Sequence, residues 1–530
     1  MTVNSSEAIA INLTNNGQPV FEDAFTPSFT YAIFGEEETI IGYKDLTINL
    51  QFRAHDMKPS LKIDYAEKIP TNAVRDEKLK ELMDIEGKLA DYLPESALNA
   101  EEGASNGSAA NGTSKWTPPG ELAHTYTSEG STFQIWRSSL TDLRALEILA
   151  NMRILVPFFI EGGTIGFLDE PAWSLERWKL FLLYEVSNPT PTAASDYTLA
   201  GFSTSYRLWV FPSDDITKMA SYSSGNAQAK PDFSPERTSM PTPISPLDLL
   251  SRERISQFII LPPFQGQSHG AHLYNTMVSL FRSDPLCFEI TVEEPNEQFD
   301  VLRDMNDMAY LHSQLPAFTS LSLPTQISQA DLRRPMYVPD MLDSDRLLEL
   351  RGKAKLAPRQ FQRLVEIQML STIPKTNRNV HRITRKASAA DENDRRYYFW
   401  RLMVKERLFV RNKDQLVQLE EEERVPKLEE IMPGVVEEYE TRIEGFQKRV
   451  DSQGLLDIVN TLNGGAKKRE GKIVPKKRKV VEDDDDDETE DSGVETKKSK
   501  LRASMSSRGK SRVVQTTSDV EEEGVNTLHE

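Results

Sequence analysis

The stretch from residue 255 to residue 293 limits most strongly what this chain can fold into. A short apolar run, ISQFIIL (255–261), is followed by the polar, glycine-bearing loop QGQSHGA (265–271) and then by a helical pattern of apolar residues. A second apolar run, CFEITVE (287–293), comes next, is stopped by Pro295, and leads into another helical pattern. This order predicts a strand, a loop, a helix, a second strand and a second helix.

A polar loop between a strand and a helix is a candidate anion site. Its backbone N–H groups are unpaired and the positive end of the helix dipole lies behind them, which suits phosphate groups best. Two common phosphate loops are excluded, because the chain has no GxxxxGK(S/T) and because GxGxxG does not fit Gly266 and Gly270. The remaining pattern is Q-x-x-G-x-G/A, with which acetyltransferases of the GNAT superfamily hold the pyrophosphate of coenzyme A. An ordinary turn is the alternative.

Charge and composition bound the classes of partner. The formal net charge is −19 and the isoelectric point is near 5.1, which argues against direct nucleic-acid binding and favours a basic partner such as a cationic peptide. The same charge can equally serve solubility alone. The single cysteine, Cys287, excludes an intramolecular disulfide and fits a reducing compartment. The chain shows no uncharged apolar run of about 18 residues and no basic, apolar leader, so we expect neither a membrane segment nor a secretion signal.

The residues before 175 are predicted to form strands and a helix around an insertion. Apolar residues alternate with polar ones from Leu46 to Phe52 and from Leu61 to Tyr65, and a short strand is expected from Phe133 to Trp136. Residues 103–120 are rich in Gly, Ser and Asn and predict a mobile insertion. Leucines between Leu143 and Leu149 then indicate a helix.

The rest of the chain divides by its apolar spacing. The runs WKLFLLYEV (178–186) and YTLAGFSTSYRLWVF (197–211) predict a β-hairpin, and a Ser/Pro-rich stretch (213–246) follows it. Beyond residue 320 the spacing is near 3.6, as in AKLAPRQFQRLVEIQML, and predicts helices. After residue 455 charged runs replace the apolar pattern and predict a disordered tail.

Several separated blocks resemble the type B histone acetyltransferases, a family within the GNAT superfamily. They are FTYAIFGEEETIIGYKDLTINL, HTYTSEGSTFQIW, the LLYEV run, ISQFIILPPFQGQSHGAHLY with EITVEEPNEQFDVLRDMNDM, and RQFQRLVEIQML, within residues 10 to 440. The resemblance implies an α+β fold, with a GNAT core whose sheet is mixed and mainly antiparallel. It implies an N-terminal α/β domain at 1–165, the acetyl-CoA-binding core at 166–320 and a helical domain at 321–455. The disordered tail at 456–530 lies outside it.

Acetyl transfer to a lysine needs a general base. An ammonium group with a pKa near 10.4 lies roughly 3 pKa units from its neutral form at physiological pH, so freeing its lone pair costs about 4–5 kcal/mol. The resemblance assigns the base to Glu293, which we expect at the end of a central strand that Pro295 holds extended. Glu294 and Glu185 are the alternatives. Without the resemblance, Glu293 would be taken for a solvated carboxylate.

The resemblance also implies how acetyl-CoA is held. The backbone of Phe258, Ile259 and Ile260 would pair with the pantetheine arm, and one of their N–H groups would polarise the thioester carbonyl, while their side chains belong equally well to a core. The loop residues that would hold the pyrophosphate are Gln265, Gly266, Gln267, Ser268, His269, Gly270 and Ala271. Asn296 is carried over from the family as a further cofactor contact.

Ser268 and two histidines in or beside the loop bear on what it can bind. Ser268 stands where the family has its first loop glycine, and serine tolerates positive φ poorly, so we expect a slightly rebuilt loop whose N–H group can still donate. His269 and His272 have no third ligand type nearby, so no metal site is expected.

Two segments are implied for the protein substrate. Glu36, Glu37 and Glu38 would face the basic tail of histone H4, with a merely solvated surface loop as the alternative. Leu208, Trp209 and Val210 would border the channel for the extended peptide.

The leading hypothesis is a lysine acetyltransferase that uses acetyl-CoA, without a metal, on free, newly made histone H4. The resemblance implies a WD-repeat histone-binding subunit as partner and roles in chromatin and DNA repair. A GNAT enzyme for another amine and a non-catalytic histone chaperone are the alternatives; the large additions around the core argue against the first, and only Ser268 hints at the second. In the tail, PKKRKV (475–480) matches a nuclear import signal read by an import receptor, so we expect the protein in both cytoplasm and nucleus.

Overall fold

The computed structural model describes residues 1–98, 115–187, 195–210, 213–224, 247, 249–324, 326–328, 341–383 and 391–454. The predictions for most of the 103–120 insertion, for most of the Ser/Pro-rich stretch and for the tail after residue 455 lie outside these residues.

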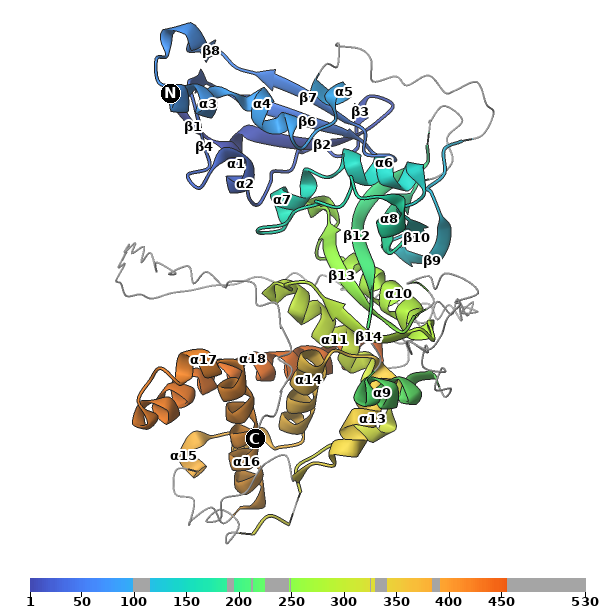
Figure 1. Ribbon diagram of the computed structural model, residues 1–530, viewed down its shortest axis with the longest axis vertical. Helices are drawn as coiled ribbons and strands as arrows, with labels where there is room; N and C mark the ends of the chain where they lie inside the picture. Colours follow the sequence, from blue (N-terminus) through green and yellow to red (C-terminus); the bar gives the residue numbers. More distant parts are fainter. Residues whose placement is uncertain are drawn as a thin grey trace, which may run out of the picture. The chain divides into compact units, whose positions relative to one another are not determined.

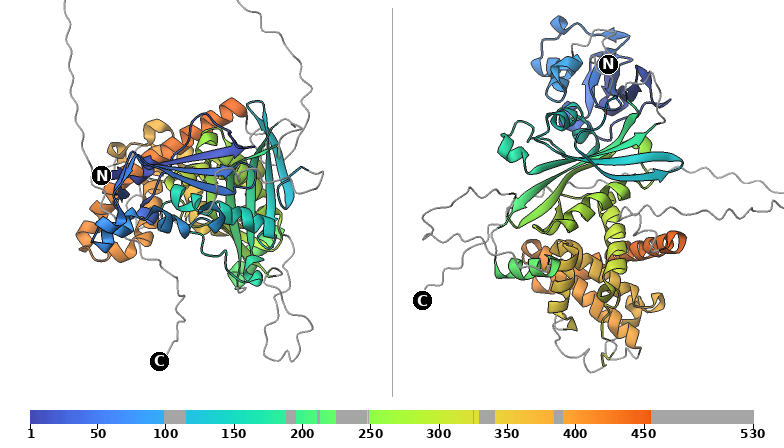
Figure 2. Two further views of the ribbon diagram at one scale, coloured as in Figure 1. Left: turned by 90° about the horizontal axis from the view of Figure 1, so that it is seen from above. Right: turned by 90° about the vertical axis from the view of Figure 1, so that its right-hand side faces the viewer.

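A six-stranded sheet carries the region predicted as the acetyltransferase core (Figure 1). Its strands are β9 (Glu121–Ser128), β10 (Ser131–Ser139), β11 (Trp178–Val186), β12 (Tyr197–Trp209), β13 (Ser251–Ile260) and β14 (Cys287–Val292). Their order in space is β14-β13-β12-β11-β10-β9, and every neighbouring pair is antiparallel except β13 and β14, which are parallel. The predicted hairpin and the predicted mixed, mainly antiparallel sheet are confirmed; Figure 2 shows the twist of the sheet from two further sides.

The connection between β13 and β14 explains why they are parallel. The helix α10 (His269–Ser283) crosses over from the end of β13 to the start of β14, and a helical crossover returns the chain in the same direction. Because β12 already occupies one side of β13, β14 adds to the other side and lies at the edge of the sheet. The prediction that Glu293 ends a central strand is therefore wrong.

The N-terminal residues form a second sheet, of four strands. Its order is β3 (Gln18–Pro19), β2 (Ile9–Asn15), β6 (Thr47–Arg53) and β7 (Pro59–Asp64), with β2 and β6 parallel. The alternating residues of β6 are buried, as predicted, whereas Tyr65 lies beyond the end of β7 and is 46% exposed. The smaller elements are α1 (Ser5–Ala8), α2 (Tyr31–Phe34), α3 (Glu77–Met83), α4 (Ile85–Ala90), α5 (Glu95–Leu98) and the strand pairs β1 (Thr2–Asn4) with β4 (Thr39–Ile41) and β5 (Tyr43–Lys44) with β8 (Glu67–Lys68).

The six-stranded sheet crosses the domain boundary predicted at residue 165. Strands β9 and β10 precede this residue but join the sheet through the pairing of β10 with β11. The predicted helix between them and β11 is α6 (Leu143–Asn151), although Leu143 itself is exposed, and the short helices α7 (Leu155–Phe159) and α8 (Ala172–Leu175) follow it.

The residues beyond β14 are helical, as predicted. The helices are α11 (Glu297–Gln314), α12 (Pro316–Thr319), α13 (Ser344–Ala354), α14 (Pro358–Ser371), α15 (Val380–Ile383), α16 (Glu392–Arg411), α17 (Lys413–Leu416) and α18 (Glu421–Gln453), and α9 (Asp214–Ser224) packs on α13. Apolar side chains of α11, α14, α16 and α18 build a second hydrophobic core, separate from that of the two sheets. None of the helices among the described residues is both long and apolar enough to cross a membrane.

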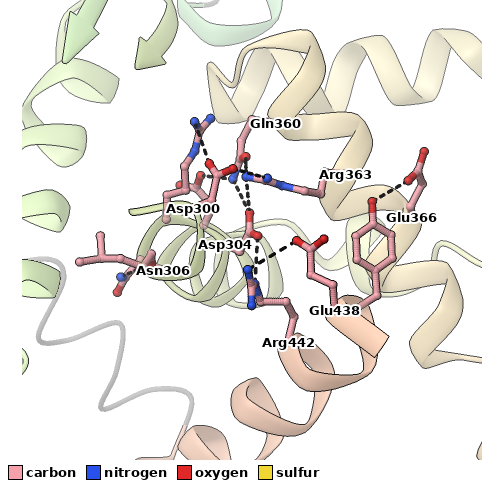
Figure 3. A network of polar contacts seen from close by, with 12 residues as sticks. Asp300, Asp304, Asn306, Gln360, Arg363, Glu366, Glu438 and Arg442 are labelled. Carbon is pink, nitrogen blue, oxygen red and sulfur yellow. Dashed lines mark hydrogen bonds and ion pairs between the residues drawn. The ribbon is translucent and has the colours of Figure 1, made fainter. Parts of the chain in front are cut away.

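A buried polar network ties α11 to the C-terminal helices (Figure 3). Asp304 of α11 is 1% exposed and contacts Gln360 and Arg363 of α14, each at 3.0 Å, while Arg442 of α18 lies 3.5 Å from its other oxygen. Burial, the largest effect, raises the pKa of Asp304 to about 6 against the opposing arginines. Because α11 begins a few residues after Glu293, this network fixes the element next to the candidate site.

Candidate active site

Strands β13 and β14 separate at Glu293. They pair from Ser251 to Ile255, and the last bond is donated by the Glu293 N–H group to the Ile255 carbonyl at 2.9 Å. Strand β13 then continues to Ile260, and no strand among the described residues pairs with this side of it. The result is an open strand edge that begins at a carboxylate.

The direction of the backbone groups along this edge follows from one hydrogen bond. The Leu261 N–H group donates to Ala200, which precedes Gly201 on β12, at 2.9 Å. Because successive residues of a strand alternate in direction, Ile259 also directs its backbone groups toward β12, whereas Phe258 and Ile260 direct theirs to the open edge. The side chain of Gln265 donates to the Ile260 carbonyl on this edge at 2.8 Å. Of the three residues predicted to pair with pantetheine, Phe258 and Ile260 therefore present their backbone, and Ile259 does not.

The loop after β13 adopts left-handed backbone at two positions. Gly266 has φ +77°, with open space around its α-carbon, and Ser268 has φ +67° directly before α10 begins. Ser268 thus takes up the conformation that glycine would adopt, at a cost of roughly 1 kcal/mol. The loop is not rebuilt around the serine as we expected, because the serine backbone itself adopts the left-handed conformation.

The N–H groups of residues 266–270 make the candidate anion site. Among the described residues they meet no backbone acceptor, whereas the N–H groups of Gln265 and Ala271 donate to Pro262 and Ser268. Gln265 and Ala271, both in the predicted loop, therefore have their backbone N–H groups engaged within the chain. Gly270 also has a packing role, because a side chain on it would lie 2.9 Å from Leu302 of α11. Its missing side chain allows α10 and α11 to pack closely.

The side chain of His269 is directed into the protein and is closed off from solvent. It is 1% exposed, and burial lowers its pKa, although Glu185 opposes the shift. His272 stacks on Tyr126 with ring centroids 3.7 Å apart, and burial, together with His124, His269 and Arg449, lowers its pKa to about 4. Only the backbone of His269 is left for an anion. Among the described residues no group of three or more His, Cys, Asp or Glu side chains could hold a metal ion.

The carboxylate of Glu293 is held by a neighbouring hydroxyl group. Ser256 lies opposite Glu293 where the strands separate, and its Oγ is 2.6 Å from Glu293 Oε2. Glu293 itself is exposed. Glu294 has φ +35°, where the chain turns from β14 toward α11, and Glu185 lies on β11, with β12 and β13 between it and β14. Ser256 was not singled out in the sequence, although it stands inside the ISQFIIL run.

Comparisons with known proteins show the family to which the chain belongs. Residues 1–161 match the family model described as "Histone acetyl transferase HAT1 N-terminus", and residues 337–373 match the model "Fungal HAT1, C-terminal". The histone acetyltransferase type B catalytic subunit of Aspergillus oryzae is 38% identical over 85% of this chain and 87% of its own length. That of Schizosaccharomyces pombe is 30% identical over 84% and 93%. The chain belongs to the family of type B histone acetyltransferase catalytic subunits. The predicted family and enzyme class are confirmed.

Asn296, predicted to contact the cofactor of this acetyltransferase, caps α11. Its side-chain oxygen accepts a hydrogen bond from the Phe299 N–H group at 2.8 Å. An N-cap of this kind satisfies one of the free N–H groups at the start of a helix. The side chain therefore fixes where α11 begins, four residues after Glu293.

The two predicted substrate segments of the acetyltransferase differ in how much they leave exposed. The carboxylate of Glu38 accepts hydrogen bonds from the N–H group and the hydroxyl group of Thr30, at 2.6 and 2.9 Å, so that Glu38 is half-buried whereas Glu36 and Glu37 are exposed. Leu208, Trp209 and Val210 lie at the end of β12, where β13 begins, and thus at the opposite end of β13 from Phe258 and Ile260. Trp209 is 38% exposed, and the guanidinium group of Arg177 lies 5.9 Å from its ring.

Proposed function

We propose that this chain transfers an acetyl group from acetyl-CoA to a lysine side chain of free histone H4, with Glu293 as general base. The observation that carries the proposal is the open edge of β13, which has a carboxylate at one end and a row of free N–H groups at the other. The names of the relatives support histone as the substrate class. The choice of H4, and of Glu293 as base, extends beyond those names.

The residues present fit an extended thioester cofactor. Phe258 and Ile260 offer backbone groups to an amide-containing arm, which can pair with the strand as a further strand would. The N–H groups of residues 266–270, at the start of the fifteen-residue helix α10, suit the pyrophosphate. A backbone N–H group of β13 near Glu293 is suited to polarise the thioester carbonyl.

Glu293 would act on the incoming lysine. Its carboxylate takes a proton from the ammonium group, which frees the lone pair at a cost of about 4–5 kcal/mol at neutral pH. The amine then attacks the carbonyl carbon, a C–N bond forms, the C–S bond breaks, and the thiolate leaves and is protonated. The bond from Ser256 engages Oε2, so that Oε1 would be the oxygen that takes the proton.

The exposed acidic and aromatic residues suit a basic peptide. Glu36 and Glu37 are free to attract lysines, and Trp209 offers an aromatic face to an extended chain. We further propose a WD-repeat histone-binding subunit as partner and passage between cytoplasm and nucleus through an import receptor that binds PKKRKV. These two proposals rest on the family resemblance and on the tail sequence alone.

Release of coenzyme A distinguishes this function from its alternatives. The full chain is mixed with acetyl-CoA and, separately, with an H4 tail peptide, the same peptide with its lysines replaced by arginine, or a polyamine. We expect thiol release with the first peptide only. Release with the polyamine and not with the peptide would indicate a GNAT enzyme for another amine, and binding of histone without release would indicate a chaperone.

A further inference from the structure

Three hydrogen bonds in series connect the anion loop to the far strand of the sheet. The hydroxyl group of Tyr126, on β9, lies 2.8 Å from His269 Nδ1. His269 Nε2 lies 3.3 Å from Gln267 Oε1, and Gln267 Nε2 donates to the Pro263 carbonyl at 3.2 Å. The series thus begins on a rigid strand and ends on both sides of Gly266.

The chemistry of the groups fixes the direction of each bond. Because the amide nitrogen of Gln267 donates to Pro263, its Oε1 faces His269 and can only accept, so Nε2 of His269 carries the proton. Nδ1 is then an acceptor, and Tyr126 donates to it. With a neutral His269 imidazole, each hydrogen bond in the series has one donor and one acceptor. The burial of His269 favours this neutral form.

The ring of Tyr126 packs against two other rings. Its ring stacks on Phe133 of β10, with centroids 5.4 Å apart, and on His272 of α10, at 3.7 Å. The residue is 8% exposed. The hydroxyl group therefore projects from a ring that has little freedom to move.

The loop needs such an anchor because of its backbone. Gly266 and Ser268 both have positive φ, at +77° and +67°, and glycine is free to leave that region at no steric cost. If the loop spends only a fraction of its time in the binding conformation, the apparent affinity for a phosphate falls by that fraction.

We propose that Tyr126 and His269 are positioning residues for cofactor binding, which hold Gln267 and so keep the N–H groups of residues 266–270 directed at the pyrophosphate. This inference rests on the proposed function, because it takes the loop as the pyrophosphate site. Neither side chain touches the cofactor in this proposal. Their effect is confined to the phosphate-bearing part of it.

Two thioesters separate this role from a general structural one. Steady-state kinetics of Tyr126→Phe are compared with acetyl-CoA and with acetyl-pantetheine, which lacks the pyrophosphate. We expect KM for acetyl-CoA to rise roughly 3- to 10-fold with kcat at saturation unchanged, the effect of one lost buried hydrogen bond. For acetyl-pantetheine, kcat/KM should stay within about 2-fold of the wild type.

Tyr184→Phe is the matched control. Tyr184 is also buried in this sheet, on β11, and its hydroxyl group donates to the His55 carbonyl at 2.9 Å, away from the loop. We expect Tyr184→Phe to leave KM for acetyl-CoA and kcat/KM for acetyl-pantetheine unchanged from the wild type. An equal loss with both thioesters in Tyr126→Phe, or no loss with either, would overturn the inference.

A double mutant tests whether the groups act in series. Gln267→Ala removes the other end of the series, so Tyr126→Phe combined with Gln267→Ala should raise KM for acetyl-CoA no more than the stronger single variant does. If the rise in KM of the double variant equalled the product of the two single rises, the two residues would act separately, and the series would be refuted. If the wild type itself used both thioesters equally well, the pyrophosphate site, and with it the proposed function of the loop, would fail first.

Discussion

Ser256 donates a hydrogen bond to Glu293 at the point where β13 and β14 separate, with Oγ 2.6 Å from Oε2. The backbone N–H group of the same glutamate is held by Ile255 at 2.9 Å. Both ends of this residue are thus fixed to β13, although its carboxylate is exposed. A general base must lie within hydrogen-bond reach of its proton, and this pair of contacts limits where the carboxylate can lie.

Replacement of the base tests the mechanism most directly. Glu293→Gln keeps the shape and the bond to Ser256 but cannot take a proton, so we expect kcat to fall by roughly two to four orders of magnitude. Binding of acetyl-CoA, measured by calorimetry, should stay near normal. Glu294→Gln and Glu185→Gln are the comparison variants, and a larger loss in either of them would move the role of base to that residue.

Removal of the serine hydroxyl should weaken the same step without abolishing it. Ser256→Ala leaves Glu293 in place, but its carboxylate becomes free to rotate. Loss of a hydrogen bond to a charged group should lower kcat roughly 10-fold. KM for the peptide should change little, and Ser256→Thr should restore most of the rate. A fully active Ser256→Ala enzyme would show that Glu293 needs no such support.

Two substitutions in the anion loop should act in opposite directions. Ser268→Gly relieves positive φ at a non-glycine residue and should stabilise the protein by about 1 kcal/mol, which corresponds to roughly 2 °C in Tm. Gly266→Ala introduces the same strain at φ +77° and should lower both Tm and the affinity for coenzyme A. Thermal unfolding and calorimetry of the two variants check this, and a shift of both in one direction would contradict it.

The stacked His272 predicts a loss of stability in mild acid. Its pKa is lowered to about 4 in the folded protein, chiefly by burial, while an unfolded histidine titrates near 6.5. Between these values the unfolded chain binds more protons, so the contribution of this group is complete above about pH 6.5 and is lost as the pH falls toward 4. This difference between the folded and unfolded pKa values corresponds to roughly 3 kcal/mol in the free energy of unfolding.

His272→Phe isolates this contribution, because it keeps an aromatic ring against Tyr126 without the proton. We expect the stability difference between pH 7 and pH 4.5, measured by chemical denaturation, to shrink in the variant. His124 and His269, whose pKa values burial also lowers, remain in both proteins, so the difference between the proteins reports His272 together with its electrostatic coupling to these two neighbours. An equal acid loss in variant and wild type would show that His272 contributes nothing.

The sequence predicts the elements of the site better than their pairing. Residue spacing is enough for the strand at Ile255, the loop and the helix at Leu273, since each follows from a local period. The bond between Ser256 and Glu293 depends on a parallel register between strands 37 positions apart at these residues, which local spacing does not contain. The edge position of β14 was missed for the same reason. The turn of His269 into the core was missed because a histidine in a polar loop gives no sign of the tyrosine that will meet it.

The tail after residue 455 is expected to determine where in the cell the enzyme acts. PKKRKV at 475–480 lies after α18, which ends at Gln453, and a short run of lysines and arginines is the feature that import receptors bind. A chain that ends after residue 455 keeps both hydrophobic cores and every residue of the proposed site, so we expect full thiol release with an H4 peptide. In cells, a fluorescent fusion of this shortened chain should accumulate in the cytoplasm, and replacement of the four basic residues of PKKRKV by alanine in the full chain should have the same effect. Nuclear fluorescence equal to the wild type in both would refute the import signal, whereas loss of thiol release in the shortened chain would show that the tail serves catalysis instead.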